Sequence, residues 1–327
     1  MSAAIGFHAS HEQHAPSALL ELVQRAEATG FTEAMCSDHF APWIRIQGQS
    51  GFTWSWLGAA MHATTMTFGT VCAPGQRYHP AVLAQAAATL GEMFPGRFWV
   101  AVGSGEALNE SITGDAWPSK DLRNRRLGES ADIMRALWAG QTVTHDGLVR
   151  VKAARLYSRP AQPPLLLGAA LTPETARWTG GWADGLITAA GARSRMRRVI
   201  DAFREGGGAD KPLYLQAAVS YAGTDAESLR LAHEHWPQAA LPERLLADLE
   251  TPIEFERASK SVEPRDVLGG VRASADVGRH LAWLADDLDM GFTRIYLHNV
   301  NPDHARFFEE LAPPALELIP NRRGLAR

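Results

Sequence analysis

Eight short apolar segments, separated by longer amphipathic stretches, recur along the whole chain. Runs of Val, Ile, Leu, Ala and Phe without polar alternation are typical of parallel strands that are buried on both faces. The expected strands are residues 4–9, 33–37, 67–73, 98–103, 165–169, 185–188, 213–221 and 294–299. Strict alternation of eight such strands with helices predicts an α/β fold of the (β/α)₈ TIM-barrel type rather than an open sheet.

The stretches between these strands contain recognisable helix ends and two long insertions. Pro16 suits the first turn of a helix, and Gly30 suits its left-handed end. Asp146-Gly147 predicts a two-residue hairpin turn within residues 142–157. Residues 224–272 are polar and partly helical. We therefore expect a single barrel domain over residues 1–327, with a hairpin insertion at 142–157 and a helical lid at 224–272 over the C-terminal mouth.

Composition narrows the cellular setting and the partners. With 32 basic and 36 acidic side chains, the formal charge of -4 gives no reason to expect nucleic acid or an anionic membrane as partner. Cys36 and Cys72 both lie in apolar runs, which is typical of buried free thiols in a reducing compartment. No signal-like N-terminus and no apolar run of membrane-spanning length is present. These features predict a soluble cytoplasmic protein with a small-molecule substrate.

Common nucleotide, hydrolase and metal motifs are missing. A Rossmann sheet needs G-x-G-x-x-G after its first strand, whereas residues 9–13 read Ala-Ser-His-Glu-Gln. The chain contains no G-x-S-x-G elbow, no phosphate-binding G-x-x-x-x-G-K-[ST] loop, and no histidine or cysteine spacing typical of zinc sites. No metal ligand is therefore assigned.

Polar residues follow the second expected strand, where a barrel carries its active site. His39 can exchange a proton near neutral pH, and the indole of Trp43 offers a flat face that can cover a ring. Asp38 precedes His39 directly, so its side chain points elsewhere. A capping loop with an exposed histidine is an equally reasonable interpretation of this motif alone.

Two acids follow other strands. Glu106 lies in Gly-Ser-Gly-Glu-Ala-Leu-Asn-Glu at 103–110, where a raised pKa would suit an acid or base, and Asn109 can hydrogen-bond a ring carbonyl or amide. Acids at a helix N-terminus are the alternative interpretation. Glu12, after the first strand, resembles a cap but would share the mouth with His39 and Glu106.

Small residues at the ends of two strands suggest a surface for a planar cofactor. Val71, Cys72 and Ala73 precede a Pro-Gly turn, and Arg77 beyond it is expected to anchor the loop. A second group precedes a helix whose N-terminal amides suit a phosphate, namely Gly168, Ala169 and Ala170. The arginines after the sixth strand are expected to be mostly a solvated helix face, with one available for an anion.

Several of these strings resemble the luciferase-like flavin monooxygenase superfamily. They are Ser-Asp-His-Phe-Ala-Pro-Trp at 37–43, Arg-Tyr-His-Pro-Ala at 77–81 and the string at 103–110. Within that superfamily the chain most resembles the F420-dependent glucose-6-phosphate dehydrogenase branch. It also shares Gly-Phe-His-Ala-Ser-His-Glu-Gln at 6–13 and Ala-Pro-Gly-Gln-Arg-Tyr-His-Pro at 73–80 with a subgroup described as FMN-dependent.

The resemblance implies a barrel that holds a flavin or deazaflavin at its mouth, and a homodimer. It implies that Asp38, His39, Trp43, Glu106 and Asn109 contact the ring or the substrate and that Glu12 lies in the active site. It further implies a non-proline cis peptide near residues 71–72.

The chain departs from the dehydrogenase branch where that branch binds sugar phosphate. The matching positions are the uncharged Ala192, Leu246 and Gly269, with Arg193 or Arg257 as possible replacements. The loop after the third strand is also one residue shorter. Glucose 6-phosphate is therefore not expected to be the substrate.

These features predict an oxidoreductase that uses FMN, by monooxygenation or hydride transfer, on a small organic substrate, with His39 and Glu106 handling protons. An F420-dependent dehydrogenase of an alcohol or sugar is the alternative. A metal-dependent barrel hydrolase or isomerase using Asp38, His39 and Glu106 is an alternative of another class. A barrel that binds flavin without turnover is a third.

Overall fold

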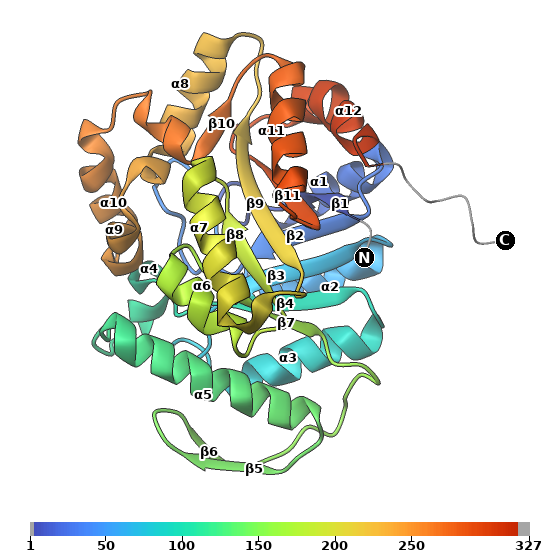
Figure 1. The fold of residues 1–327 in the computed structure, drawn as a ribbon, viewed down its shortest axis with the longest axis vertical. Helices are drawn as coiled ribbons and strands as arrows, with labels where there is room; N and C mark the ends of the chain where they lie inside the picture. Colours follow the sequence, from blue (N-terminus) through green and yellow to red (C-terminus); the bar gives the residue numbers. More distant parts are fainter. Residues whose placement is uncertain (1–2, 320–327) are drawn as a thin grey trace, which may run out of the picture.

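The computed structural model describes residues 3–319 and shows a closed barrel of eight parallel strands (Figure 1). Neighbouring strands pair in chain order, and β9 pairs with both β8 and β11, which closes the ring. The predicted (β/α)₈ fold is confirmed, and every predicted strand is found to within one residue. The barrel strands are β1 (Ala4–His8), β2 (Glu33–Ser37), β3 (Thr67–Cys72), β4 (Phe98–Val102), β7 (Leu165–Ala169), β8 (Gly185–Ala189), β9 (Leu213–Ser220) and β11 (Arg294–Asn299).

Helices surround the barrel as expected for this fold. Pro16 begins α1, and Gly30 ends it with φ of 116°, a conformation that favours glycine. Asp276 caps the N-terminus of α11, where its side chain accepts a hydrogen bond from Gly278 N. The larger helices are α1 (Pro16–Thr29), α2 (Thr53–Ala63), α3 (Pro80–Met93), α5 (Lys120–Trp138), α6 (Pro173–Gly180), α7 (Arg193–Phe203) and α11 (Val277–Asp289), and the short α12 (Ala312–Glu317) follows near the C-terminus.

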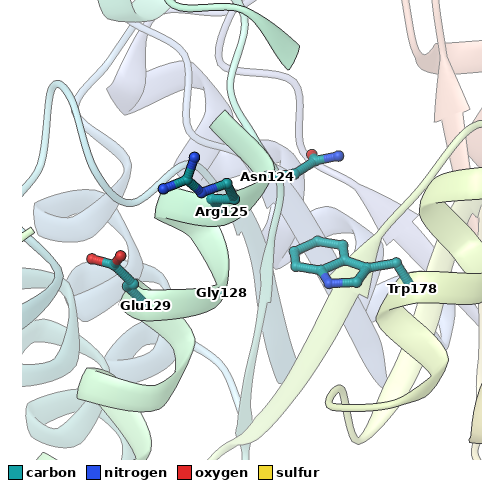
Figure 2. Close-up of a pocket in the computed structure, with 5 residues that line it drawn as sticks. All are labelled: Asn124, Arg125, Gly128, Glu129 and Trp178. Carbon is teal, nitrogen blue, oxygen red and sulfur yellow. The ribbon is translucent and has the colours of Figure 1, made fainter. Parts of the chain in front are cut away.

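The outer helices leave shallow hollows between them. Figure 2 shows one between α5 and α6, lined by Asn124, Arg125, Gly128, Glu129 and Trp178. None of these residues lies at a strand end, so this hollow is separate from the barrel mouth. No described helix is both long enough and apolar enough to cross a membrane.

Two additions decorate the barrel. Strands β5 (Val143–Asp146) and β6 (Arg150–Ala154) form an antiparallel hairpin beside α5, where His145 Nε2 lies 3.0 Å from Glu129 Oε2. Helices α8 (Asp225–His235), α9 (Glu243–Asp248) and α10 (Pro252–Ala258) follow β9. The chain then returns as β10 (Val271–Ala273), which pairs with β9 outside the closed ring. At this return, Asp225 Oδ1 accepts hydrogen bonds from Ser274 Oγ at 2.9 Å and from Ala275 N at 2.7 Å.

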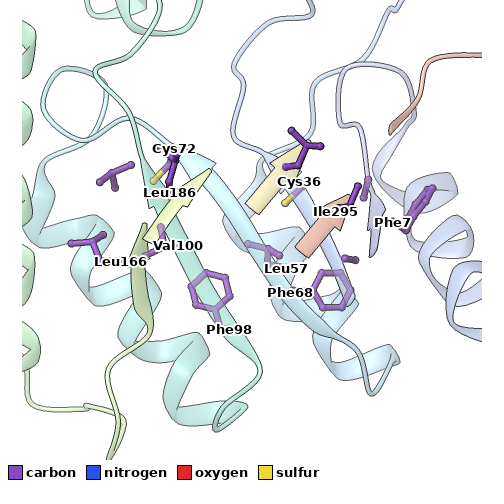
Figure 3. Packing of buried hydrophobic residues seen from close by; sticks show 14 of the residues in the cluster. Phe7, Cys36, Leu57, Phe68, Cys72, Phe98, Val100, Leu166, Leu186 and Ile295 are labelled. Carbon is purple, nitrogen blue, oxygen red and sulfur yellow. The ribbon is translucent and has the colours of Figure 1, made fainter. Parts of the chain in front are cut away.

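Side chains of the strands point alternately outward and inward, as in other barrels. The outward set packs against the helices and includes Phe7, Phe68 and the free thiols Cys36 and Cys72 (Figure 3). The inward set forms a second cluster, whose members are Met35, Trp99, Ala101, Leu167, Ile187, Tyr214 and Tyr296. Glycines admit the large inward rings: a Cβ at Gly69 would overlap the Trp99 ring.

Candidate active site

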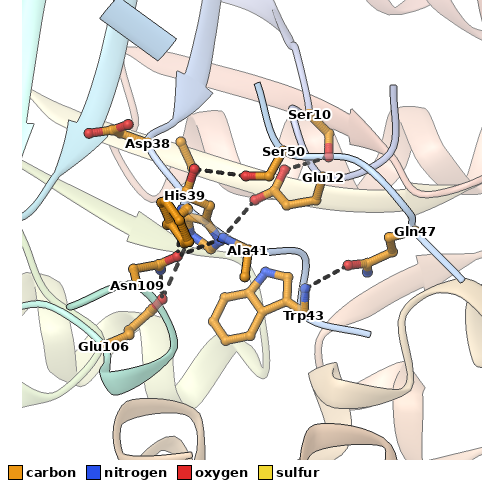
Figure 4. Close-up of polar contacts among 12 residues, drawn as sticks. Ser10, Glu12, Asp38, His39, Ala41, Trp43, Gln47, Ser50, Glu106 and Asn109 are labelled. Atoms are coloured by element: carbon orange, nitrogen blue, oxygen red, sulfur yellow. Dashed lines mark hydrogen bonds and ion pairs between the residues drawn. The ribbon is translucent and has the colours of Figure 1, made fainter. Parts of the chain in front are cut away.

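His39 lies on the loop after β2, held between two carboxylates (Figure 4). Its Nδ1 is 3.1 Å from Glu12 Oε1, and its Nε2 is 3.7 Å from Glu106 Oε2. Ser10 Oγ donates to the other oxygen of Glu12 at 2.8 Å. Burial works against ionisation of Glu12, but His39, His8 and the Ser10 hydrogen bond outweigh it and hold the pKa of Glu12 below its usual value. An ionised Glu12 therefore faces Nδ1 of the ring, and Nε2 lies on the side of Glu106.

Glu106 directly precedes α4 (Ala107–Glu110), and its side chain is 32% exposed. Burial raises the pKa of Glu106; His39 opposes this effect and Glu12 reinforces it. Asn109 Nδ2 donates to Glu106 Oε2 at 3.2 Å, while Asn109 Oδ1 accepts from Phe40 N at 2.8 Å. Asn109 thus ties the loop after β4 to the loop after β2, and one amide hydrogen is left for the ring contact that we expected.

Asp38 points away from His39 into a buried ion network. Arg77 Nη2 donates to Asp38 O at 2.7 Å and lies 3.2 Å from Asp38 Oδ2. The backbone N of Arg77 donates to Glu110 Oε2 at 2.7 Å, and its Nε lies 3.5 Å from Glu110 Oε1. Burial raises the pKa of both carboxyls, and Arg77 opposes it. Asp38 is therefore a support for the loop, and Glu110, the second carboxylate that contacts Arg77, was not predicted.

Trp43 closes one side of the site. Its ring meets the His39 ring edge-on at 5.0 Å and the Phe255 ring of α10 at 5.1 Å. Gln47 Oε1 accepts from Trp43 N at 2.9 Å, and Gln47 Nε2 donates to His235 O at the end of α8 at 3.0 Å. Residues of the insertion after β9 thus hold Trp43 beside His39.

Small inward-facing side chains line the β3, β4 and β7 side of the mouth. Val71, Ala101 and Ala169 all belong to or pack against the inner cluster. A Cβ at Gly103 would meet nothing nearer than Ala169 Cβ, at 3.6 Å. This half of the mouth therefore has an apolar lining.

Three other residues that we assigned to the cofactor, Cys72, Gly168 and Ala170, face the outer helices and not the mouth. Cys72 and Ala170 pack in the outer cluster, and a Cβ at Gly168 would collide with Thr179 of α6. Only the backbone of these residues is available to a ligand at the mouth. Ala73, beyond β3, lies beside Gly105, where a Cβ would be 3.3 Å from it.

The structure differs from two further expectations, which concern the peptide bond near residues 71–72 and the arginines after β8. Every peptide bond between residues 3 and 319 is trans, so the expected cis peptide near residues 71–72 is not present. Arg193 pairs with Asp286 at 2.8 Å on the surface. Arg195 instead bridges the loops after β7 and β8, because its guanidinium donates to Leu171 O at 3.2 Å and Ala189 O at 2.8 Å.

Three polar side chains at the inward ends of strands were not predicted: His8, Gln216 and His298. The available signal was a polar residue inside an apolar strand run. The described residues contain no group of three or more His, Cys, Asp or Glu side chains arranged to hold a metal ion.

A closed parallel barrel with a histidine between two carboxylates at its C-terminal mouth has the architecture of a TIM-barrel enzyme. The chain belongs to the luciferase-like monooxygenase family, whose model matches residues 1–293. This result confirms the family that the sequence motifs resemble.

The relatives refine this family assignment. The F420-dependent glucose-6-phosphate dehydrogenase of Beutenbergia cavernae is 35% identical over 334 residues, covering 99% of this chain and 98% of the relative. Its counterpart in Mycobacterium tuberculosis (strain ATCC 25618 / H37Rv) is 34% identical over 335 residues, covering 94% and 97%.

Solved structures agree with this similarity. An F420-dependent secondary alcohol dehydrogenase in complex with an F420–acetone adduct superposes with a TM-score of 0.90 at 30% identity, covering 97% of this chain and 99% of that one. The FMN-bound oxygenating constituent of a Baeyer–Villiger monooxygenase from Pseudomonas putida has a TM-score of 0.72 at 15% identity, with 98% and 99% covered, and so shares the fold. The protein is thus an oxidoreductase, and its relatives favour F420 over the FMN that we expected.

Proposed function

We propose that this protein is an F420-dependent dehydrogenase that oxidises an uncharged alcohol. The observation that carries the proposal is the placement of His39 between two carboxylates, with Nδ1 3.1 Å from Glu12 and Nε2 on the side of Glu106. An imidazole held in this way can accept a hydroxyl proton as the carbon is oxidised. The names of the relatives at 30–35% identity support F420 as the cofactor.

The mouth fits a deazaflavin ring. The apolar half built from Val71, Ala101 and Ala169 would hold one face of the ring, and the free amide hydrogen of Asn109 would meet its polar edge. A deazaflavin bound there supplies a two-electron hydride acceptor.

Each residue around His39 has a distinct role in moving the proton. His39 Nε2 takes the proton of the substrate hydroxyl, and ionised Glu12 stabilises the imidazolium that results. Ser10 holds Glu12 in place. Burial raises the pKa of Glu106, so more of it is protonated near neutral pH than of a surface glutamate, and it could supply the proton that the cofactor takes up with the hydride. Trp43 covers the reacting groups and excludes water.

The positions that bind the sugar phosphate in the resembling branch carry no charge in this chain. Ala192, Leu246 and Gly269 replace basic residues expected from the resemblance. Arg193 is paired with Asp286 on the surface, and Arg195 is occupied by backbone carbonyls. An alcohol without a phosphate group is therefore the substrate class that the site supports.

The proposal is tested by binding and turnover. Apo-protein is titrated with F420 and, separately, with FMN, and F420 reduction is followed with propan-2-ol and with glucose 6-phosphate. We expect binding of F420 and turnover of the uncharged alcohol. His39→Asn should lower kcat by about 10²- to 10⁴-fold with little change in the Kd of F420.

His62→Asn is the matched control, since His62 is an exposed histidine of α2. It should retain native turnover. Tight binding of FMN without binding of F420, or full turnover by His39→Asn, would contradict the proposal.

A further inference from the structure

The other half of the barrel mouth is polar. His8, Gln216 and His298 each lie two residues beyond a position of the inner layer, on β1, β9 and β11, so they point into the barrel above that layer. The three side chains touch: Gln216 Nε2 is 3.3 Å from His8 Nε2, and the His8 and His298 rings lie 4.3 Å apart between centroids. We call these three residues the polar floor.

The hydrogen bonds of His298 define which of its nitrogens carries the proton. Gln13 Nε2 donates to Val300 O at 2.9 Å, which turns Gln13 Oε1 toward His298. That oxygen is 2.7 Å from His298 Nε2 and can only accept. In a neutral ring, Nε2 therefore carries the hydrogen, and Nδ1 is a lone-pair acceptor. His298 is 1% exposed, and its Nδ1 has no partner among the described residues.

His8 shows the opposite arrangement. His8 Nε2 faces Gln216 Nε2 at 3.3 Å and Ser37 Oγ at 3.5 Å; since the amide nitrogen can only donate and the hydroxyl can also donate, the hydrogen of the neutral His8 ring lies on Nδ1. His8 is also 1% exposed, and its Nδ1 is likewise without a partner in the described chain. Burial lowers the pKa of His8 to about 4, against the opposing effect of Glu12, so the ring is neutral at physiological pH. The polar floor therefore presents one buried donor and one buried acceptor on adjacent rings.

A hydroxyl group both donates and accepts a hydrogen bond through a single oxygen atom. A carbonyl or an ether oxygen only accepts, and an ammonium only donates. A buried imidazole nitrogen without a hydrogen-bond partner is unfavourable. A hydroxyl bound between the two rings would remove this penalty because it can pair with both nitrogens. The polar floor also adjoins the loop that carries His39, because His8 Nε2 lies 3.5 Å from Ser37 Oγ at the end of β2.

The side walls around the polar floor are aromatic and apolar. Trp236, at the end of α8, meets the His298 ring edge-on at 4.5 Å. Trp43 and Ala218 pack with Trp236 in one cluster. Such walls suit the carbon skeleton of a small alcohol and offer no cation for an anionic group.

We propose that the polar floor binds a second hydroxyl group of the substrate, so that the protein prefers uncharged polyhydric alcohols over monohydric ones. This inference rests on the proposed function, and it adds the substrate class. His8 and His298 are substrate-binding residues here, whereas His39 handles the reacting hydroxyl.

Paired probes test the preference. The holoenzyme with F420 is assayed with butane-2,3-diol and with butan-2-ol, which differ by one hydroxyl. We expect kcat/KM to be about tenfold or more higher for the diol, since a site built to bind a hydroxyl rejects an analogue without it. His8→Phe and His298→Phe should bring this ratio close to one, with the Kd of F420 unchanged.

His280→Phe is the matched control, because His280 is equally buried with an unpartnered Nδ1 but lies on α11 outside the barrel. It should keep the native ratio. A native ratio near one, or a ratio that persists in both floor variants, would overturn the inference.

A measurement without turnover separates this inference from the proposed function. In ¹⁵N-histidine NMR spectra of the cofactor-free protein, His298 should carry its hydrogen on Nε2 and His8 on Nδ1. Butane-2,3-diol should shift both resonances, and butan-2-ol should leave them in place. Absence of F420 reduction would refute the dehydrogenase proposal alone. Unchanged resonances with the diol, or the opposite tautomers, would refute the role of the polar floor.

Discussion

Replacing Arg77 with Met removes the guanidinium that lies between two buried carboxylates. The side chains of Arg77, Asp38 and Glu110 are 7%, 0% and 2% exposed, respectively. The guanidinium also lies over the Tyr78 ring, 4.5 Å from its centroid. Methionine retains much of the aliphatic volume, so the variant mainly tests the loss of charge and hydrogen bonds.

The expected loss is large because two charges remain behind. Breaking a buried pair by removing one partner costs about 3–5 kcal/mol, since the other charge stays buried and uncompensated. Both carboxyls already have raised pKa values that Arg77 opposes. Without Arg77 their pKa values should rise further, so the loss should shrink toward acid pH, where the carboxyls become protonated.

Urea denaturation at pH 7 and pH 5, followed by circular dichroism, measures this effect. The control is Arg230→Met, which breaks the exposed Arg230–Glu234 pair on α8 and should cost less than about 1 kcal/mol. A loss in Arg77→Met that is no greater than in Arg230→Met, or that grows toward pH 5, would refute the reasoning.

Three further outcomes are expected. Gly69→Ala should lower the free energy of unfolding by about 1–3 kcal/mol, measured by urea denaturation, because the added Cβ overlaps Trp99; a neutral effect would contradict this packing. Burial lowers the pKa of His8 and of His11 to about 4, so the unfolded chain binds more protons between pH 6.5 and 4. The free energy of unfolding should therefore be highest above about pH 6.5 and fall by about 3 kcal/mol per histidine as the pH drops to 4. Urea midpoints that stay constant over this range would contradict this prediction. Because the pKa of Glu106 is raised and its acid form is the active one, kcat should fall on the alkaline side as Glu106 loses its proton, and Glu106→Gln should abolish that limb of the pH profile.

The strands were predictable because each is an apolar run long enough to stand out from its helical flanks. Strand β10 was not predictable, because Val271–Ala273 has only three residues and is recognised as a strand only from its pairing with β9. The direction of side chains within an apolar run was equally hidden. Cys72 and Ala170 face the helices, whereas Val71 and Ala169 face the mouth. This orientation was not predictable because every residue in a uniformly apolar run is compatible with either face of the strand.

The meeting of Glu12, His39 and Glu106 was predictable because the ends of parallel strands gather at one rim. Their detailed pairing was not. The tautomer of His298 depends on Gln13, and the orientation of Gln13 depends on Val300, which is 287 positions away in the chain. No local pattern encodes a contact across that separation.

The hydrogen bonds between Asp225 and residues 274–275 have a consequence for the history of this enzyme type. They fasten together the two ends of a long excursion from the barrel, next to the β9–β10 pair. With its ends joined, doubling the length of such a segment costs only about 0.6 kcal/mol of closure entropy. Natural selection can therefore lengthen, shorten or rewrite the cover of the mouth while the barrel beneath keeps its register. New substrates then become accessible without any change to the strands that hold the reaction centre.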